Sequence, residues 1–509
     1  MSPVYKNIVA NYLGNFITAI LAFLFVPVYV HFLGVGTFGI IGFFATLQVL
    51  FSFLDMGIGM AINREMARHY HDESKAAYLR NLTHTLQIVY WSIGLVIGAI
   101  LLLSSSFLSA NWFKETDIPQ HTILVAFFIL SITIAFRWPY SLYSSGLRGM
   151  QHQVALNVHD LFWNLTKTIG SWVVIKYIDN SLPAFLWFQC SVTVLQTVGT
   201  MLMLWYYMPK DSEKRKIVFD KKILKGIGRY AAGMGVAVIL IQVMGQMDKV
   251  IVSKMVSDTQ FGYYIIAGNV AILVNTLSYP LYMGILPHFT KLFFENRKEE
   301  IKKDYHFYTR LLYCLVLPFS IVIFFYSKEF LWLWTKNSQL ADSISPILRL
   351  MIAGTTLNAM VVPIQTLLLA ANKVRFILYS NIAAFILAIP VIMFLTIRFG
   401  VTGGAISVLV LFGGFFLIQA PLIFRVLRMQ DGLIRWYLKD VLFFAIPLVA
   451  ISLGLAQFNS RIITTDRWQL FWNLAAITVS FYGITFLMNK RLRYLIGNLF
   501  KKLRRGSLT

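Results

Sequence analysis

Long apolar runs, separated by short polar connections, set the pattern of this chain. In the stretch 24–68, two apolar runs flank a short loop, and the second ends abruptly in charge at Arg64, Glu65 and Arg68. Apolar runs of about 20 residues without soluble-type alternation are typical of membrane-spanning helices. The pattern predicts about fourteen transmembrane helices, at 8–31, 38–63, 83–110, 121–146, 154–178, 183–208, 226–252, 260–286, 306–327, 345–371, 376–399, 402–427, 438–458 and 466–488.

Composition supports an all-α polytopic membrane protein. Of the 509 residues, 58% are hydrophobic and only 13% are charged, whereas soluble domains carry about a quarter charged residues. The two cysteines, Cys190 and Cys314, lie inside apolar runs, so neither a disulfide framework nor a metal site is expected. The first run is too long for a signal-peptide core and is expected to remain as the first span.

The basic balance of the chain follows a topological pattern. The net charge of +23 would suggest nucleic acid as a partner of a soluble protein. Here Lys and Arg concentrate in alternate connections, chiefly 64–80, 210–225, 291–310 and the tail from Lys490, while the opposite connections carry few. The positive-inside rule then predicts that both termini are cytoplasmic, and no nucleic-acid partner is expected. The basic tail is expected to lie on anionic lipid headgroups.

Weak internal similarity divides the chain into halves. Phe38-Gly39 resembles Phe261-Gly262, and Trp112-Phe113-Lys114 resembles Trp334-Thr335-Lys336 at nearly the same offset. Six spans per repeat give both halves the same orientation, as in transporters built from parallel repeats. The expected organisation is an N-terminal six-helix bundle (1–208), a cytoplasmic linker (209–225), a second six-helix bundle (226–428), two additional spans (429–488) and a basic cytoplasmic tail (489–509).

Polar stripes inside the spans mark the candidate site. Asn157, Asp160, Asn164, Lys167 and Ser171 recur at spacings of 3, 4, 3 and 4, so they share one face of a helix. Charged groups at membrane depth are costly and face protein or water. Further intramembrane charges occur at Asp55, Arg137, Arg229, Asp248, Lys249 and Arg349.

Each of these groups also has a purely structural interpretation. Polar amides and hydroxyls commonly hold membrane helices together by hydrogen bonds. Asp55 and Asp248 could simply pair with a neighbouring cation, and Arg229 and Arg349 could extend to the membrane interface. Arg137, Lys167 and Lys249 favour a functional role, because a deep cation suits an anionic ligand.

Several stretches resemble a known family. These are the opening from Pro27 through Leu33-Gly34 and Phe38-Gly39 to LDMGIGMAINREMA (54–67), then GLRGMQHQ (146–153) and MDKVIVSKMVSDTQFGYY (247–264). They resemble Wzx-type polysaccharide flippases, the O-antigen and capsule repeat-unit exporters of the multidrug/oligosaccharidyl-lipid/polysaccharide (MATE-like) superfamily. The resemblance extends over essentially the whole chain in length and span count.

The resemblance implies a V-shaped MATE-like fold, alternating access and a cationic central cavity. The implied substrate is an undecaprenyl-pyrophosphate-linked oligosaccharide, moved from the cytoplasmic to the periplasmic leaflet of the bacterial inner membrane for surface polysaccharide biosynthesis. A polysaccharide polymerase and a chain-length regulator are candidate partners. No cofactor is expected, although transport could be coupled to an H⁺ or Na⁺ gradient.

The position of each charge in the chain assigns the candidate roles. The expected substrate-binding set for pyrophosphate and sugar is Arg137, Lys167 and Lys249, with Arg229, Arg349 and Asn164 as further contacts. The carboxylates expected to orient these cations, or to carry a coupling proton, are Asp55, Asp160 and Asp248.

Three alternatives remain at this point. A MATE-type drug or metabolite antiporter would share the fold, but cationic drugs call for an acidic cavity. A membrane-embedded polymerase, ligase or glycosyltransferase would be expected to carry a large external loop or an external acidic motif, and neither is present, so an enzyme is not expected. A scaffold or scramblase-like component is the third. An ATP-driven pump is disfavoured because no GxxxxGK[ST] sequence occurs.

Overall fold

The computed structural model describes residues 3–52, 57–113, 117–211, 213, 215–226, 243–429, 431–457, 466–489 and 491–494. Every regular element within these ranges is a helix. The chain forms two compact units, Met1–Gly262 and Tyr263–Thr509. Ten helical segments in the described part are long and apolar enough to cross a membrane by length and composition. The chain is therefore an all-helical multi-pass membrane protein, as predicted.

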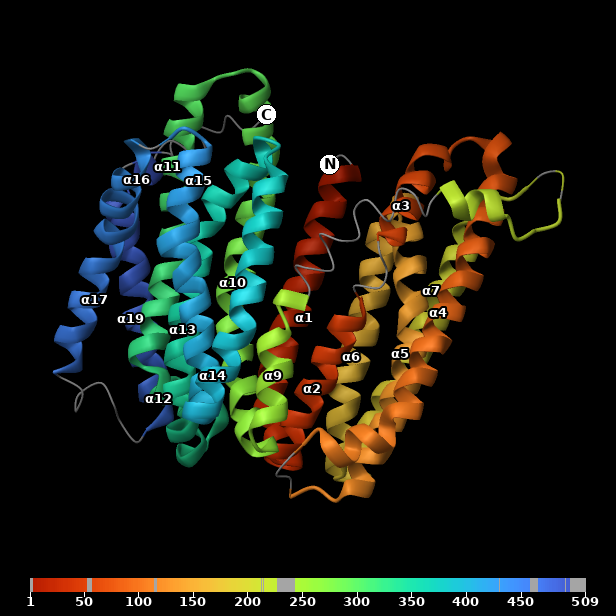
Figure 1. Ribbon diagram of the computed structural model, residues 1–509, viewed down its shortest axis with the longest axis horizontal. Helices are drawn as coiled ribbons and strands as arrows, with labels where there is room; N and C mark the ends of the chain where they lie inside the picture. The colour runs from red at the N-terminus through yellow and green to blue at the C-terminus, as the bar shows by residue number, and fades with distance from the viewer. Residues whose placement is uncertain are drawn as a thin grey trace. The chain divides into compact units, whose positions relative to one another are not determined.

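The first unit contains the helices that carry the candidate site (Figure 1). Its described helices are α1 (Pro3–Leu33), α2 (Val35–Ser52), α3 (Ile58–His69), the short turn η2 (Glu73–Lys75), α4 (Ala76–Asn111), α5 (Gln120–Gly149), α6 (Gln153–Tyr177), α7 (Leu182–Tyr207), α9 (Met247–Met255) and the first turn of α10 (Asp258–Phe294).

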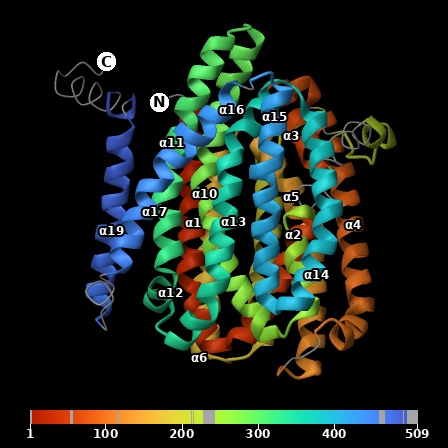
Figure 2. The same ribbon diagram turned by 60° about the vertical axis from the view of Figure 1, so that its left-hand side comes forward.

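The second unit holds the remainder of α10 and all later helices (Figure 2). These are α11 (Lys298–Phe325), α12 (Ser327–Thr335), α13 (Ser338–Ala370), α14 (Val374–Gly414), the π-helical segment η3 (Phe415–Gln419), α15 (Ala420–Val426), α16 (Asp431–Arg435), the π-helical segment η4 (Trp436–Leu442), α17 (Phe443–Ala456) and α19 (Arg467–Met488). Here α11 packs against η4, α17 and α19.

Three predicted spans differ from the helices that the structure contains. The predicted span 38–63 is not one helix, because α2 ends at Ser52 and α3 begins at Ile58 after Gly57, which is left-handed at φ 74°. Asp55 lies between them, outside the described residues. The predicted spans 376–399 and 402–427 instead form one nearly continuous helical run, broken at Gly400, where φ is 58° and ψ is −140°. Glycine reaches these angles readily because it has no Cβ.

The fourteen-span count stays a prediction. The predicted first and fifth spans are the helices α1 and α6, and neither is among the ten segments counted as candidate spans. The predicted seventh span, 226–252, falls mostly outside the described residues. The division into bundles, linker and tail likewise stays a prediction.

Close glycine contacts hold α5 in place within the first unit. The helices α4 and α5 pack side by side, and α5 also packs on α7 (Figure 1). A Cβ built at Gly94 or Gly98 of α4 would lie 2.6 Å or 2.9 Å from a backbone oxygen of α5. Small residues four apart let membrane helices approach closely in this way. The backbone of α5 is therefore held tightly against a neighbour where it carries Arg137.

The two Phe-Gly pairs of the internal repeat meet inside the first unit. A Cβ at Gly39 of α2 would lie 2.5 Å from the carbonyl oxygen of Asp258 and 2.9 Å from the amide nitrogen of Gly262. A Cβ at Gly262 would lie 2.3 Å from the carbonyl oxygen of Val35. The glycines are therefore required where α2 crosses the first turn of α10.

We expect Gly39→Ala to destabilise the protein, although glycine is normally the poorer helix former. The added methyl group would collide with backbone, and overpacking of this kind costs about 1–3 kcal/mol. The melting temperature of the purified protein in detergent measures the effect. Gly268→Ala is the matched control: a Cβ there meets nothing within 4 Å, so this change should be neutral or stabilising. Equal melting temperatures for the two variants would contradict the expectation.

His152 closes the turn between α5 and α6. Its Nε2 lies 3.0 Å from the hydroxyl of Tyr70, and its ring stacks on Tyr207 with centroids 3.9 Å apart. Burial lowers the pKa of His152 below its ordinary value of 6.5. The neutral imidazole is therefore favoured over the protonated form more strongly in the folded protein than in the unfolded chain.

This shift predicts a stability contribution that depends on pH. Below about pH 6.5 the unfolded chain binds a proton that the folded turn resists, so stability falls as the pH is lowered through that range. When the pH is lowered from about 8 to about 5.5, we expect the melting temperature of His152→Gln to fall less than that of the wild type. The exposed His121, changed to Gln, serves as the control. An unchanged pH profile in His152→Gln would refute the contribution.

Candidate functional site

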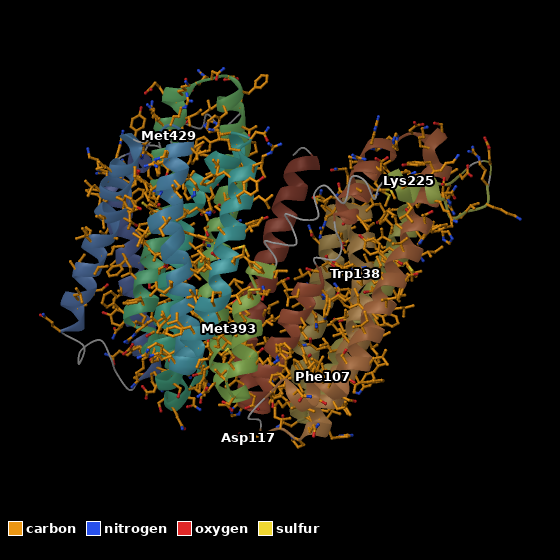
Figure 3. All side chains as sticks on the ribbon, viewed as in Figure 1. Phe107, Asp117, Trp138, Lys225, Met393 and Met429 are labelled. Atoms are coloured by element: carbon orange, nitrogen blue, oxygen red, sulfur yellow. The ribbon has the colours of Figure 1, made fainter. Side chains whose placement is uncertain are left out.

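Arg137 lies near the middle of α5, next to Trp138, which Figure 3 labels halfway along the helix. Its side chain is exposed, although its neighbours Trp138 and Pro139 are buried. Within the described part of the chain, Arg137 makes no hydrogen bond and no ion pair. An exposed guanidinium that makes no hydrogen bond or ion pair, at the middle of a spanning helix, is available to an external anion.

A carboxylate is fixed beside this arginine. The hydroxyl of Tyr140, one turn after Arg137, donates to both oxygens of Asp160 on α6 at 2.7 Å. Gln196 of α7 donates its amide to Asp160 Oδ1 at 3.1 Å. Arg137 is within electrostatic range of Asp160. Asp160 therefore accepts three hydrogen bonds, from the side chains of Tyr140 and Gln196.

His159 lies next to the same carboxylate, that of Asp160. Its Nδ1 is 3.8 Å from Asp160 Oδ1, and its Nε2 accepts a hydrogen bond from the indole of Trp163 at 2.9 Å. Gly199 of α7 makes the room, since a Cβ there would lie 2.8 Å from His159 Nε2. The site thus depends on three helices, α5, α6 and α7.

Lys167 lies two turns further along α6. Its Nζ donates to Thr193 Oγ1 of α7 at 2.9 Å, and this hydroxyl donates to the carbonyl oxygen of Gln189 at 2.8 Å. No carboxylate pairs with Lys167 among the described residues. Lys167 and Arg137 are close enough to repel each other electrostatically. The structure therefore brings two cations close to each other, with an anchored carboxylate near Arg137.

The remaining candidate residues lie elsewhere. Asn164 is half-buried on α6 between Asp160 and Lys167. Lys249, on α9 next to Asp248, donates to Gln246 Oε1 of the adjoining turn at 2.8 Å. Arg349 belongs to the second unit, on α13, where it donates to Ser327 Oγ at 2.8 Å. Arg229 and Asp55 lie outside the described residues.

Of the nine candidates, the structure thus gathers Arg137, Lys167 and Asp160, with Asn164 on the same helix. We call this group the α5–α6–α7 cluster. The hydrogen bonds of Lys249 and Arg349 are made to residues outside it.

The contribution of α7 to the cluster was not predicted from the sequence. Thr193 and Gln196 anchor Lys167 and Asp160, and Tyr140 supplies the shortest hydrogen bonds to the carboxylate. A signal for α7 was present, because Gln189, Thr193, Gln196 and Thr200 recur at spacings of 4, 3 and 4. This is the same polar periodicity that identified α6.

The chemistry that this cluster can perform is anion binding. Arg137 and Lys167 offer charge-assisted donors of the kind that bind phosphate, while Asp160 balances only one positive charge. The described residues contain no group of three or more His, Cys, Asp or Glu side chains that could hold a metal ion. The two cations therefore suit the cluster to hold an anion.

Two family models match parts of this chain. The model of the family "Polysaccharide biosynthesis protein" matches residues 4–293, and the MatE model matches residues 234–394. A protein of Shigella flexneri named "Putative O-antigen transporter" is 23% identical over 414 residues, which cover 79% of this chain and 94% of that protein.

Solved structures show the same fold. An inward closed conformation of the lipid II flippase MurJ has a TM-score of 0.66 at 15% identity, covering 94% of this chain and 98% of that one. An inward-facing multidrug resistance MATE family transporter of the MOP superfamily has a TM-score of 0.63 at 14% identity, covering 80% and 95%. Because the family model matches more than half of the chain, this protein belongs to the polysaccharide biosynthesis protein family.

Proposed function

We propose that this protein moves an undecaprenyl-pyrophosphate-linked oligosaccharide repeat unit from the cytoplasmic to the periplasmic leaflet of the bacterial inner membrane. Transport would proceed by alternating access and serve the synthesis of a surface polysaccharide such as O-antigen or capsule. The observation that carries the proposal is the pair Arg137 and Lys167, two neighbouring cations on spanning helices, with a single carboxylate, Asp160, near Arg137.

A pyrophosphate headgroup accounts for this charge pattern. It is a compact anion that both cations could contact, and Arg and Lys are the usual donors to phosphate oxygens. The neighbouring tyrosine, threonine and amide side chains offer hydrogen bonds of the kind that sugars accept and donate. The relative of Shigella flexneri is named for O-antigen transport, which fits the same class of substrate.

The MATE family model and fold keep a drug antiporter as the second candidate. The α5–α6–α7 cluster would repel a cationic drug, since two charged side chains of the cluster are cations. This disfavours a cationic cargo for that site. The two functions also differ in what the cell loses when the gene is removed.

A gene deletion in the source organism tests the proposal. Loss of surface polysaccharide, with lipid-linked repeat units accumulating on the cytoplasmic face, is the expected result, and expression of the wild-type chain should restore the polymer. The same strains are tested for growth with cationic drugs. Intact polymer together with altered drug sensitivity would reject the flippase and support the antiporter.

A further inference from the structure

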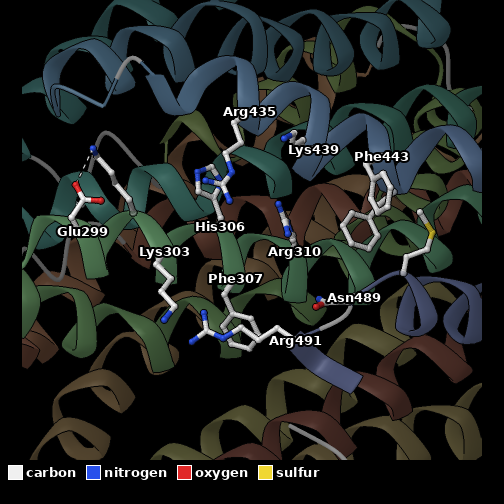
Figure 4. A pocket seen from close by; sticks show the side chains of 13 residues that line it. Glu299, Lys303, His306, Phe307, Arg310, Arg435, Lys439, Phe443, Asn489 and Arg491 are labelled. Carbon is white, nitrogen blue, oxygen red and sulfur yellow. Dashed lines mark hydrogen bonds and ion pairs between the residues drawn. The ribbon is translucent and has the colours of Figure 1, made fainter. Parts of the chain in front are cut away.

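The second unit contains a cavity of about 660 Å³ that the function proposed above does not use. It is formed by α11, the segment from α16 through η4 to α17, and the end of α19 (Figure 4). Its lining residues are Glu299, Lys302, Lys303, His306, Phe307, Arg310, Arg435, Lys439, Phe443, Phe444, Met488, Asn489 and Arg491. Six of these are Lys or Arg, against one carboxylate.

The cations of this cavity are only partly neutralised. Lys302 pairs with Glu299 at 3.3 Å, and Arg491 pairs with Asp304 at 3.2 Å. Lys303, Arg435 and Lys439 form no ion pair within the described part of the chain. The close-up view shows Arg435 and Lys439 on one wall, with His306 and Arg310 near them. An anion in the cavity would therefore meet several unpaired charges at once.

A hydrogen bond to a buried carboxylate fixes the orientation of Arg310 in the cavity. Its Nε donates to Asp440 Oδ1 at 2.6 Å, and Asp440 is completely buried. His306 contacts the other oxygen of the same carboxylate through Nδ1. With Nε occupied, the two terminal nitrogens of Arg310 make no hydrogen bond among the described residues, and the side chain is 31% exposed. This leaves a fixed fork of donors that matches phosphate geometry.

The remaining walls are apolar. Phe307 lies under the guanidinium of Arg491 at 4.2 Å, and Phe443, Phe444 and Met488 complete the lining. Phe443 is 50% exposed, and the helices α17 and α19 that lead away from the cavity expose further large apolar side chains: Ile446, Leu453, Phe471, Trp472, Val479 and Leu487. The cationic cavity thus lies at the end of two helices that expose large apolar side chains, which suits an amphiphile better than a soluble anion.

We propose that this cavity binds the phosphate headgroup of an anionic membrane lipid, with the acyl chains lying along α17 and α19. The lipid phosphate takes its donors from Arg310, Arg435 and Lys439, and its chains cover the exposed apolar side chains of the two helices. The site lies in the second unit, so it neither requires nor replaces the α5–α6–α7 cluster of the first.

Native mass spectrometry of the full-length protein in a neutral detergent tests this site. Phosphatidic acid, phosphatidylcholine and inorganic phosphate are titrated separately. The wild type should bind phosphatidic acid in preference to phosphatidylcholine. The variant Arg435→Gln with Lys439→Gln should bind phosphatidic acid about 30-fold more weakly, since each basic residue near an anionic lipid strengthens binding roughly fivefold.

The control variant is Lys336→Gln with Arg398→Gln, which removes one exposed lysine and one exposed arginine of the same unit outside the cavity. It should bind like the wild type, and unchanged melting temperatures without lipid confirm that both variants are folded. Equal affinity of the two variants for phosphatidic acid overturns the site. Inorganic phosphate that competes fully with the lipid at equal concentration overturns the lipid as the source of the phosphate.

A second readout leaves the wild-type sequence intact. Phosphatidic acid should protect Lys303 and Lys439 from acetylation severalfold, while Lys336 reacts as before. Phosphatidylcholine should give no such protection. Equal acetylation of Lys439 with and without phosphatidic acid would contradict the proposal even if a cavity variant failed to fold.

Discussion

Export of lipid-linked repeat units should be abolished when Arg137 and Lys167 are both replaced by glutamine. Each charge-assisted hydrogen bond to an ionised ligand contributes about 1.5–3 kcal/mol, so losing two weakens binding by about two to four orders of magnitude. The amount of protein in the membrane should change little. Arg137 has no partner to lose among the described residues, and Lys167 loses a single hydrogen bond, to Thr193. Surface polysaccharide in a complemented deletion strain measures the effect.

The same two helices provide the matched control. Arg148 of α5 and Lys176 of α6 are exposed and lie near the helix ends, so replacing both by glutamine removes the same two charges away from the cluster. That variant should export normally. The exchange Arg137→Lys should retain part of the activity, because it keeps the charge and loses only the planar fork. Normal export by the Arg137→Gln, Lys167→Gln variant would remove the basis of the proposed function.

The sequence was sufficient for the fold because a spanning helix needs little more than length and apolar composition. It was less informative about breaks within a span. Gly57 and Gly400 separate or bend helices through backbone angles that only the surrounding packing selects. In the predicted span 38–63, glycines at 57 and 59 lay within an apolar run, where membrane helices often tolerate them.

For the internal repeat too, the sequence pattern predicted equivalent positions but not the contact between them. Matching Phe38-Gly39 to Phe261-Gly262 identified two equivalent places in the sequence. It did not reveal that the two glycines touch, since a recurring offset carries no information about distance in space. The contact arises from the crossing of α2 with the first turn of α10, where each glycine meets backbone of the other helix.

The site residues that share one helical face were predicted from periodicity. The residues that join the site through tertiary contacts were missed. The spacing of Asp160 and Lys167 places them on one face of α6 whatever surrounds the helix. Which neighbour that face meets depends on packing, so Gln196 and Thr193 of α7 entered only with the structure. Arg349 illustrates the converse, because an intramembrane arginine looks alike in sequence whether it faces a ligand or, as here, a serine of the preceding helix.

The largest loss of stability is expected from Asp440→Ala in the second unit. This buried carboxylate accepts hydrogen bonds from Arg310 and His306, and so ties η4 to α11. Removing one member of a buried ion pair leaves its partner uncompensated, at a cost of about 3–5 kcal/mol. The lower figure applies here, because Arg310 is 31% exposed and solvent compensates part of its charge. The melting temperature in detergent should fall clearly.

Asp342→Ala is the control that separates burial from charge. Asp342 also pairs with a basic residue, Lys328, at 2.5 Å, but the two side chains are 57% and 50% exposed. An exposed pair of this kind contributes about 0–1 kcal/mol, so the melting temperature of Asp342→Ala should stay near that of the wild type. Asp440→Asn should fall between the two, because it keeps an acceptor for Arg310 while losing the charge. If Asp440→Ala and Asp342→Ala had the same melting temperature, the buried carboxylate would not stabilise the unit. Its remaining role would then be to position Arg310 in the cationic cavity.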